Sequence, residues 1–196
     1  MLKKLGLMSV CAASAFALHT AEININDKDL EVSGQFDIGQ FNDAVEPNTM
    51  FVGVKFLNGD SENSEHDNAD IDPYYEASFL MLKDMGDSGF RLGLGGKLNY
   101  TKDFSSLPLG VVGSYKIPAD NLVPMYVNAE VFYAPSVLSF SDADSYFETR
   151  ISYDVEIIEN GKVSVGYRKM NTNYDDSKGG DFTYNKSWYI GFKFSF

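Results

Sequence analysis

The chain contains two histidines, and one of them lies among residues that could support hydrolysis. His66 is flanked by Glu65 and Asp67, and Ser61 and Ser64 precede it in the same polar segment. In serine hydrolases a histidine takes the proton from serine while a carboxylate holds its ring. A solvated histidine in a polar loop explains the same residues without any activity. We therefore expect no enzyme, with a hydrolase that uses His66 at an outer rim as the alternative.

The segment 58–72 around this histidine is strongly acidic and contains no lysine or arginine. Carboxylate oxygens are the ligands that Ca²⁺ and Mg²⁺ prefer in proteins. The glycine-centred spacing of an EF-hand loop is missing, so we predict a solvated loop with no metal site and no other cofactor. Its six carboxylates are Asp60, Glu62, Glu65, Asp67, Asp70 and Asp72.

A second set of charged residues lies in segments where apolar and polar positions alternate. In residues 89–101, for example, Phe90 and Leu92 alternate with Arg91 and Gly93, which is the period of a β-strand. Seven cations and five anions fall on such polar faces, a near balance that we expect if the groups pair in a confined interior. These predicted interior charges are Lys55, Glu76, Arg91, Lys97, Lys116, Glu130, Glu148, Arg150, Asp154, Glu156, Arg168 and Lys193.

The elements that carry these charges are strands of about ten residues, so we predict an all-β chain that forms an antiparallel transmembrane up-and-down β-barrel. A soluble barrel with its apolar face inside is the alternative. Long polar connections alternate with short ones, as in outer-membrane barrels, whose tight turns face the periplasm. The predicted strands are 49–57, 73–84, 89–101, 107–117, 124–134, 144–157, 162–172 and 183–196.

Residues 18–48 leave the number of strands open. Ile23 and Ile25 lie on odd positions, whereas Leu30 and Val32 lie on even ones. Such a change of parity requires a turn or bulge near residues 26–29. The barrel has eight strands without this segment and ten if the segment forms a hairpin.

The interior of so small a barrel is just wide enough for side chains to fill. We therefore expect the paired charges to plug it. The alternative is a narrow pore for ions or small solutes, because Gly93, Gly95 and Gly110 would leave space along the lumen. The two possibilities differ in whether the protein conducts.

The amino terminus has the order of charge and apolar residues that is typical of a secretory signal peptide. Lys3 and Lys4 precede an apolar run that is too short to span a bilayer as a helix. We predict a signal peptide over residues 1–17 and a barrel over 18–196, with cleavage after Ala21 as the alternative to cleavage after Ala17. Processing removes Cys11, the single cysteine, so no internal disulfide can form.

The last nine residues form the most distinctive segment of the chain. A closing strand must pair with the first strand, and before closure its edge can be bound by an assembly factor. The pattern is typical of the assembly signal of bacterial outer-membrane proteins, so we predict that location and recognition by the barrel-assembly machinery. The large apolar residues that alternate here are Trp188, Ile190, Phe192, Phe194 and Phe196.

The chain resembles the YfaZ family of small outer-membrane proteins. The resemblance rests on Phe132-Tyr133-Ala134-Pro135 before a polar loop, on Gly166-Tyr167-Arg168, and on the ending Gly191-Phe192-x-Phe194-x-Phe196. It implies an outer-membrane barrel without an assigned activity, so no site residue can be transferred from the family.

The net charge of −12 argues against nucleic acid as a partner, because binding phosphate backbones requires clustered lysine and arginine. Much of the negative charge falls in the predicted outer loops. The expected partners are outer-membrane lipid and lipopolysaccharide, whose phosphates could share divalent ions with the acidic loop 58–72. We expect a monomer.

Overall fold

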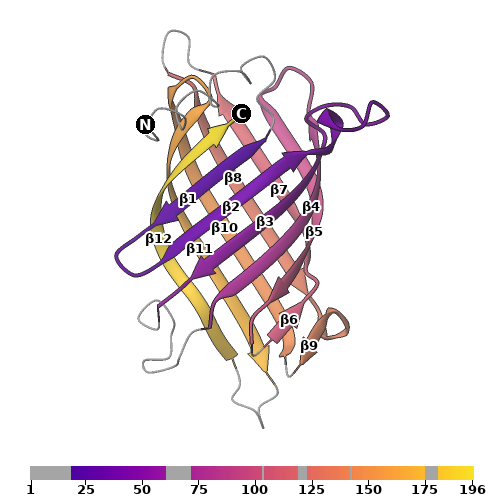
Figure 1. The fold of residues 1–196 in the computed structure, drawn as a ribbon, viewed down its shortest axis with the longest axis vertical. Helices are drawn as coiled ribbons and strands as arrows, with labels where there is room; N and C mark the ends of the chain where they lie inside the picture. The colour runs from indigo at the N-terminus through magenta and orange to yellow at the C-terminus, as the bar shows by residue number, and fades with distance from the viewer. Residues whose placement is uncertain (1–18, 61–71, 103, 119–122, 142, 175–180) are drawn as a thin grey trace, which may run out of the picture.

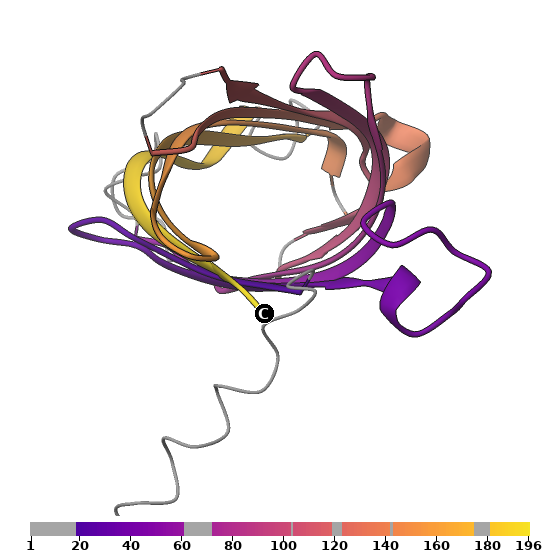
Figure 2. The same cartoon turned by 90° about the horizontal axis from the view of Figure 1, so that it is seen from above.

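Ten antiparallel strands, each hydrogen-bonded to two neighbours, close into a barrel in the computed structural model of the chain (Figures 1 and 2). The structure describes residues 19–60, 72–102, 104–118, 123–141, 143–174 and 181–196. The all-β antiparallel barrel that the alternation predicts is confirmed, with the ten strands of the hairpin alternative.

The barrel strands follow one another around the ring in chain order, and β1 pairs with β12. The ring therefore has no free edge. The strands are β1 (Thr20–Ile25), β2 (Leu30–Asp37), β3 (Met50–Asn58), β4 (Tyr74–Asp84), β5 (Phe90–Tyr100), β7 (Leu109–Ile117), β8 (Met125–Ala134), β10 (Ala143–Ile158), β11 (Gly161–Tyr174) and β12 (Asp181–Ser195).

The hairpin of β1 and β2 explains the change of parity in the sequence. Its turn is held by Asn26, whose side-chain oxygen accepts hydrogen bonds from the backbone N–H groups of Lys28 at 2.8 Å and Asp29 at 2.7 Å. Ile23 pairs with Val32 across the hairpin, so both apolar side chains lie on the outer face. The amino-terminal segment is thus part of the wall.

The two ends of the barrel differ. We call the end with Phe196 and the tight β10–β11 connection the turn end, which is uppermost in Figure 1, and the opposite end the loop end. Asn160 in that tight connection has a φ of 61°, a conformation that asparagine tolerates. The β2–β3 connection is the longest at the turn end and contains the 3₁₀ helix η1 (Ile38–Gln40).

Two short strands extend the wall at the loop end. β6 (Phe104–Ser106) pairs with the end of β5 and with β9 (Ser139–Ser141), which follows the 3₁₀ helix η3 (Ser136–Leu138). Residues 104–106, which fall between the predicted strands 89–101 and 107–117, therefore add to the sheet. No helix in the part of the chain that the structure describes is long and apolar enough to cross a membrane.

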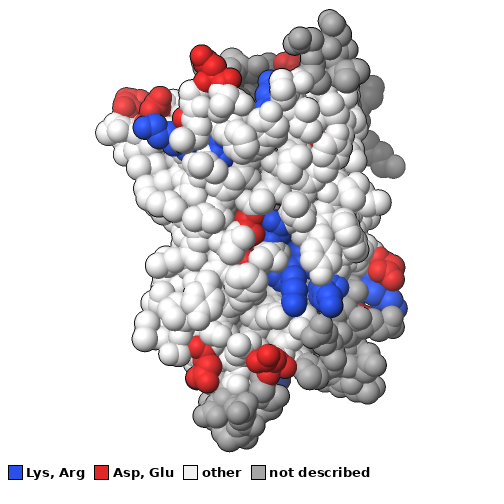
Figure 3. All heavy atoms as spheres, turned by 180° about the vertical axis from the view of Figure 1, so that it is seen from behind, with Lys and Arg blue, Asp and Glu red and all other residues white. Residues whose placement is uncertain are grey.

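The faces of the wall are inverted relative to those of a soluble barrel. Leu94 and Leu98 on β5 point outward and are 59 % and 53 % exposed, whereas Lys97 between them points inward and is 4 % exposed. In Figure 3 most of the visible wall is uncharged. An apolar cluster fills only the loop end of the interior, where it comprises Leu57, Tyr74, Phe104, Ala134, Ala143, Tyr146, Met170 and Tyr184.

Candidate functional site

Ion pairs cross the middle of the barrel interior. Lys55 Nζ on β3 lies 3.7 Å from Glu148 Oε1 on β10. These two strands are diametrically opposite, because four strands separate them in each direction, namely β2, β1, β12 and β11 one way and β4, β5, β7 and β8 the other. One ion pair thus spans the ring at this level.

Lys97 and Glu76 complete this half of the layer. Lys97 Nζ donates to Glu148 Oε1 at 2.9 Å and lies 3.4 Å from Glu76 Oε2, which Lys55 also contacts at 3.1 Å. Two ammonium groups and two carboxylates therefore form one network. Such buried ions are tolerated because each has an opposite charge and hydrogen bonds.

A second network in the same layer is built around Glu31. Its carboxylate accepts two hydrogen bonds from Arg150, at 2.8 and 2.5 Å, and one from Arg168 at 3.0 Å. Arg168 also donates to Asp29 Oδ2 at 2.9 Å and to Asn185 Oδ1 at 2.7 Å. Arg150 reaches Glu31 from β10 to β2, so this network also crosses the lumen.

Aromatic side chains form a second layer, nearer the loop end. The hydroxyl groups of Tyr74 on β4 and Tyr146 on β10 lie 3.3 Å apart, and each donates to a carboxylate of the ion-pair layer. The ring of Phe104 stacks on Tyr146 at 5.6 Å, and Tyr184 lies 5.7 Å from Tyr74. All four side chains are almost fully buried.

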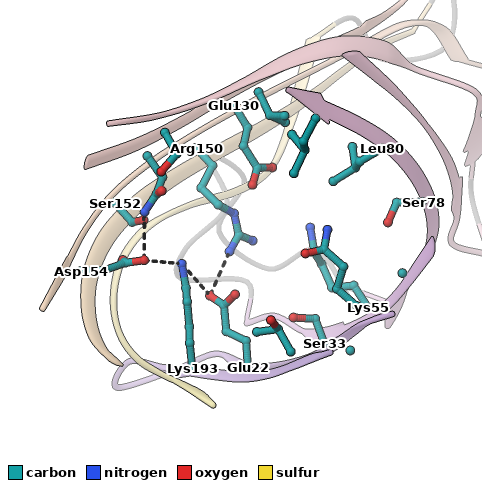
Figure 4. Close-up of a pocket in the computed structure, with 18 of the residues that line it drawn as sticks. Glu22, Ser33, Lys55, Ser78, Leu80, Glu130, Arg150, Ser152, Asp154 and Lys193 are labelled. Carbon is teal, nitrogen blue, oxygen red and sulfur yellow. Dashed lines mark hydrogen bonds and ion pairs between the residues drawn. The ribbon is translucent and has the colours of Figure 1, made fainter. Parts of the chain in front are cut away.

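On the other side of the ion-pair layer, toward the turn end, lies a cavity of about 300 Å³. Lys55 and Lys97 lie at its deep end, and Arg91 and Ser195 lie near the turn end. Figure 4 shows small side chains such as Ser33 on one side of it. The charged residues Arg150, Asp154 and Lys193 line the other side.

The charged side of the cavity retains unused hydrogen-bonding capacity. Asp154 Oδ2 accepts from Lys193 Nζ and from Asn128 Nδ2, each at 2.9 Å. Its other oxygen, Oδ1, has no hydrogen-bond partner in the structure, and neither has Arg150 Nε. An acceptor and a donor of this kind suit a hydrated cavity, because water can satisfy both.

A family model described as "YfaZ precursor" matches residues 4–196. The chain belongs to the YfaZ family. The resemblance seen in the short motifs is thus confirmed over nearly the whole chain. No curated protein matches the chain significantly. The word precursor in the family's description fits an exported protein.

Of the charges predicted for the interior of this YfaZ-family barrel, nine form ion pairs within the networks just described or on the charged side of the cavity. Glu130 joins them through Lys97 Nζ, 3.6 Å away. Three lie toward the turn end: Arg91 contacts Asp84 at 3.5 Å, Glu156 accepts from the Tyr126 hydroxyl at 3.3 Å, and Lys116 is exposed. The nine are Lys55, Glu76, Lys97, Glu130, Glu148, Arg150, Asp154, Arg168 and Lys193.

The interior charges that the sequence analysis missed include Glu22, Asp29, Glu31, Asp37 and Lys162. The first four belong to the β1–β2 hairpin, whose place in the wall the sequence left open. A signal was present, because Glu22 and Glu31 occupy the positions that alternate with outward-facing Ile23 and Leu30.

The glycines expected to leave space in the lumen do not do so. A Cβ on Gly95 would collide with Leu80, and one on Gly110 would collide with the ring of Phe132. Gly93 is covered in the same way by Leu82. Neighbouring side chains fill the room that these glycines leave. The expectation that the glycines leave space for a pore is therefore wrong.

The candidate enzyme and metal residues of the acidic loop lie mostly outside the described residues. His66, Ser61 and Ser64 are among these, with all of the loop's carboxylates except Asp60 and Asp72. Asp72 Oδ2 lies 3.9 Å from Lys102 Nζ. Within the described ranges, no group of three or more His, Cys, Asp or Glu side chains could hold a metal ion.

The predicted assembly signal forms the second half of β12 and ends one residue beyond it, at Phe196. Trp188 and Ile190 point outward and are 67 % and 61 % exposed, and Phe192 and Phe196 are also exposed. Phe194 pairs with Ala21 of β1, so the last strand closes the ring as expected of a terminal strand.

Proposed function

We propose that the protein is an integral barrel of the bacterial outer membrane, without catalytic activity, whose interior is closed to solutes. The observation that carries this proposal is the inverted distribution of side chains, with paired charges inside and large apolar side chains outside. In water the apolar face would remain exposed, whereas in a bilayer it would contact lipid. The role is then structural or one of recognition at the cell surface.

The positions of the outward aromatic side chains support a membrane position. Tyr75 and Tyr100 face each other across β4 and β5 toward the loop end. Phe90 and Tyr115 face each other toward the turn end, with ring centroids 4.5 Å apart. Membrane barrels carry such aromatic side chains at both interfaces.

Two barriers in series support a closed interior. A solute that entered the cavity from the turn end would first meet the ion pairs that join opposite strands. Beyond them it would meet Tyr74, Tyr146 and Phe104, which pack against one another. Passage requires both layers to separate.

Planar-bilayer recording of the refolded protein tests the closed interior. The wild-type protein is expected to insert without unitary current steps. Stable steps from the wild-type protein would contradict the closed interior. If the protein instead remained soluble and failed to insert into lipid vesicles, the membrane assignment itself would be wrong.

A variant that removes two side chains from each barrier provides the positive counterpart and is expected to conduct. A matched variant changes the same number of side chains at the cavity. It is expected not to conduct, because the ion-pair layer and the aromatic layer both stay in place. The barrier variant combines Lys55→Ala, Tyr74→Ala, Tyr146→Ala and Glu148→Ala. The matched variant combines Ser33→Ala, Ser78→Ala, Ser114→Ala and Ser152→Ala.

A narrow pore is the second candidate, and the cavity of about 300 Å³ favours it. This model requires the aromatic layer to move in the membrane. Arg91 lines the cavity near the turn end, so Arg91→Glu would shift the ion selectivity of a pore toward cations. If the wild-type protein conducts and this substitution leaves the selectivity unchanged, the path does not run through the cavity.

A further inference from the structure

The cavity beside the ion-pair layer reaches the turn end of the barrel and is closed at its deep end. Thr20, the first residue of β1, and Ser195, the last residue of β12, line it at the turn end. Lys55 and Lys97 line it at the deep end, where both lie within 4 Å of Glu148. With the interior closed as we propose, a solute from the turn end can occupy the cavity but cannot pass beyond it.

Two side chains of β10 that line this cavity have hydrogen-bonding atoms without a partner (Figure 4). Asp154 is 3 % exposed and Arg150 is 9 % exposed, so both are buried in the barrel. Asp154 Oδ1 requires a donor, and Arg150 Nε requires an acceptor. Because unpaired polar atoms are unfavourable when buried, the cavity suits a molecule that both donates and accepts hydrogen bonds.

The charges around the cavity balance one another. Six basic and four acidic side chains line it. Glu148 and Glu31 lie outside the lining and supply two further negative charges, since they pair with Lys97 at 2.9 Å and with Arg150 at 2.5 Å. A charged ligand would therefore meet no excess of opposite charge, whereas a neutral polar ligand would leave the existing ion pairs intact.

The other side of the cavity offers hydroxyl groups and apolar side chains. Ser33, Ser78 and Ser114 line it from β2, β4 and β7, and a hydroxyl group can both donate and accept. Leu80 and Val112 line the cavity from two of the same strands. A polyol has the matching surface, because its hydroxyl groups donate and accept while its C–H groups contact apolar side chains.

The volume of the cavity sets the size of the ligand. Pockets for small organic ligands begin at about 300 Å³, which is also the approximate volume here. We infer that the cavity binds a neutral polyol of the size of a hexose, which hydrogen-bonds to Asp154, Arg150 and the serine hydroxyl groups. This inference goes beyond the proposed function but rests on its closed interior, because in an open channel the same groups would line a path.

The test measures binding of neutral hexoses to the full mature chain in phosphatidylcholine nanodiscs. The probes are D-glucose, D-galactose and D-mannose, and a saturation-transfer NMR titration gives the dissociation constant of each. At least one hexose is expected to bind with a dissociation constant on the order of 1 mM, as expected for a ligand with so few heavy atoms. Empty nanodiscs provide the background.

The decisive variant is Ser114→Phe, which is expected to abolish hexose binding because its ring takes up space in the cavity. The matched control is Val111→Phe on the same strand, where the side chain points outward and is 52 % exposed, so binding is expected to be unchanged. A second variant, Ser33→Ala with Ser114→Ala, keeps the cavity open and removes two hydroxyl groups. At roughly fivefold for each hydrogen bond, it is expected to bind about 25-fold more weakly.

Three outcomes would overturn the inference. One is that none of the three hexoses binds the wild-type protein above the background. A second is wild-type affinity in the folded Ser114→Phe variant or in the serine-to-alanine variant, which would place the hexose outside the cavity. The third is tighter binding of D-gluconate, which has a similar size and carries a carboxylate, because that result would assign the cavity to anions.

Failure of the inference is distinguishable from failure of the proposed function. Folding of each variant is measured by the heat-dependent gel mobility of a folded barrel, and conductance is measured by planar-bilayer recording of the same preparation. A wild-type protein that inserts, does not conduct and binds no hexose refutes only the inference. A wild-type protein that conducts refutes the closed interior, whether or not it binds a hexose.

Discussion

The two halves of the barrel interior follow the same alternation of inward and outward residues, yet they are filled differently. Toward the loop end, the inward positions carry large side chains such as Tyr74, Tyr146 and Arg168, which are all almost fully buried. Toward the turn end, many inward positions carry small ones such as Ser33 and Ser114, and a cavity of about 300 Å³ remains.

The number of strands therefore does not by itself decide whether the interior of such a barrel is filled by side chains or hollow. The wall has the same ten strands at both ends. What differs is the volume of the inward side chains and how far they reach across the lumen. The loop half is closed because arginine, lysine and tyrosine are long enough to contact partners on the opposite wall.

The largest expected effect comes from removing the central carboxylate of the closed half. In Glu31→Ala, Arg150 and Arg168 would lose the group that both of them contact. Removing one partner of a buried ion pair costs about 3–5 kcal/mol. Urea unfolding of the protein folded in lipid vesicles measures the loss.

Glu22→Ala is the control in the open half. Glu22 lies 3.9 Å from Arg150 and 3.8 Å from Lys193, and its side chain is 17 % exposed. Partly solvated pairs at such distances contribute at most about 1 kcal/mol. If Glu31→Ala and Glu22→Ala lost equal amounts of unfolding free energy, the two halves would depend equally on their buried charges for stability.

An intermediate effect is expected from adding volume to each half. Ala134 has no exposed surface and lies in the apolar cluster at the loop end. Ala134→Phe is expected to destabilise the barrel by about 1–3 kcal/mol, because overpacking forces neighbours to move. The same unfolding measurement applies.

Ser114→Phe is the matched substitution in the open half, since Ser114 lines the cavity. The ring can occupy space that is now empty, so the expected change is below about 1 kcal/mol. A loss as large as that of Ala134→Phe would mean that the cavity is not available to a side chain.

The alternation of residues was sufficient to predict the wall. The faces of β5 and β10 follow from sequence because inward charges alternate with outward residues that are mostly apolar, and a shift of one residue would exchange the faces. The hairpin of β1 and β2 was harder, because its strands are short and change parity at Asn26–Asp29. The count of ten strands follows from the pairing of β1 with β12, as between Ile25 and Ile190, which no local pattern in the sequence indicates.

The filling of the interior could not be read from the sequence. Which charges meet depends on strands that lie far apart in the chain, as Lys55 and Glu148 do. Their meeting is set by the tilt of the strands and by the closure of the ring, neither of which is a local property. For the same reason, Gly95 and Gly110 indicated empty space where Leu80 and Phe132 lie.

The smallest expected effect concerns the seam that closes the open half. The backbone N–H of His19 donates to the Phe196 carbonyl at 3.1 Å, and the Phe196 N–H donates to the His19 carbonyl at 2.8 Å. The His19 ring stacks on Phe41 with centroids 5.2 Å apart. The backbone N–H of Asp37 donates to His19 Nδ1 at 3.1 Å.

These contacts favour signal cleavage after Ala17, because cleavage after Ala21 would remove His19 and the first two residues of β1. Mass spectrometry of the exported protein is expected to find Leu18 at the amino terminus. His19→Ala is expected to cost about 0.5–1.5 kcal/mol, since it removes the ring contacts and the hydrogen bond from the Asp37 N–H but leaves the backbone pairing in place. A mature chain that begins at Glu22 would show that the barrel closes without this part of the seam. The open half would then have fewer backbone hydrogen bonds between β1 and β12 as well as smaller inward side chains.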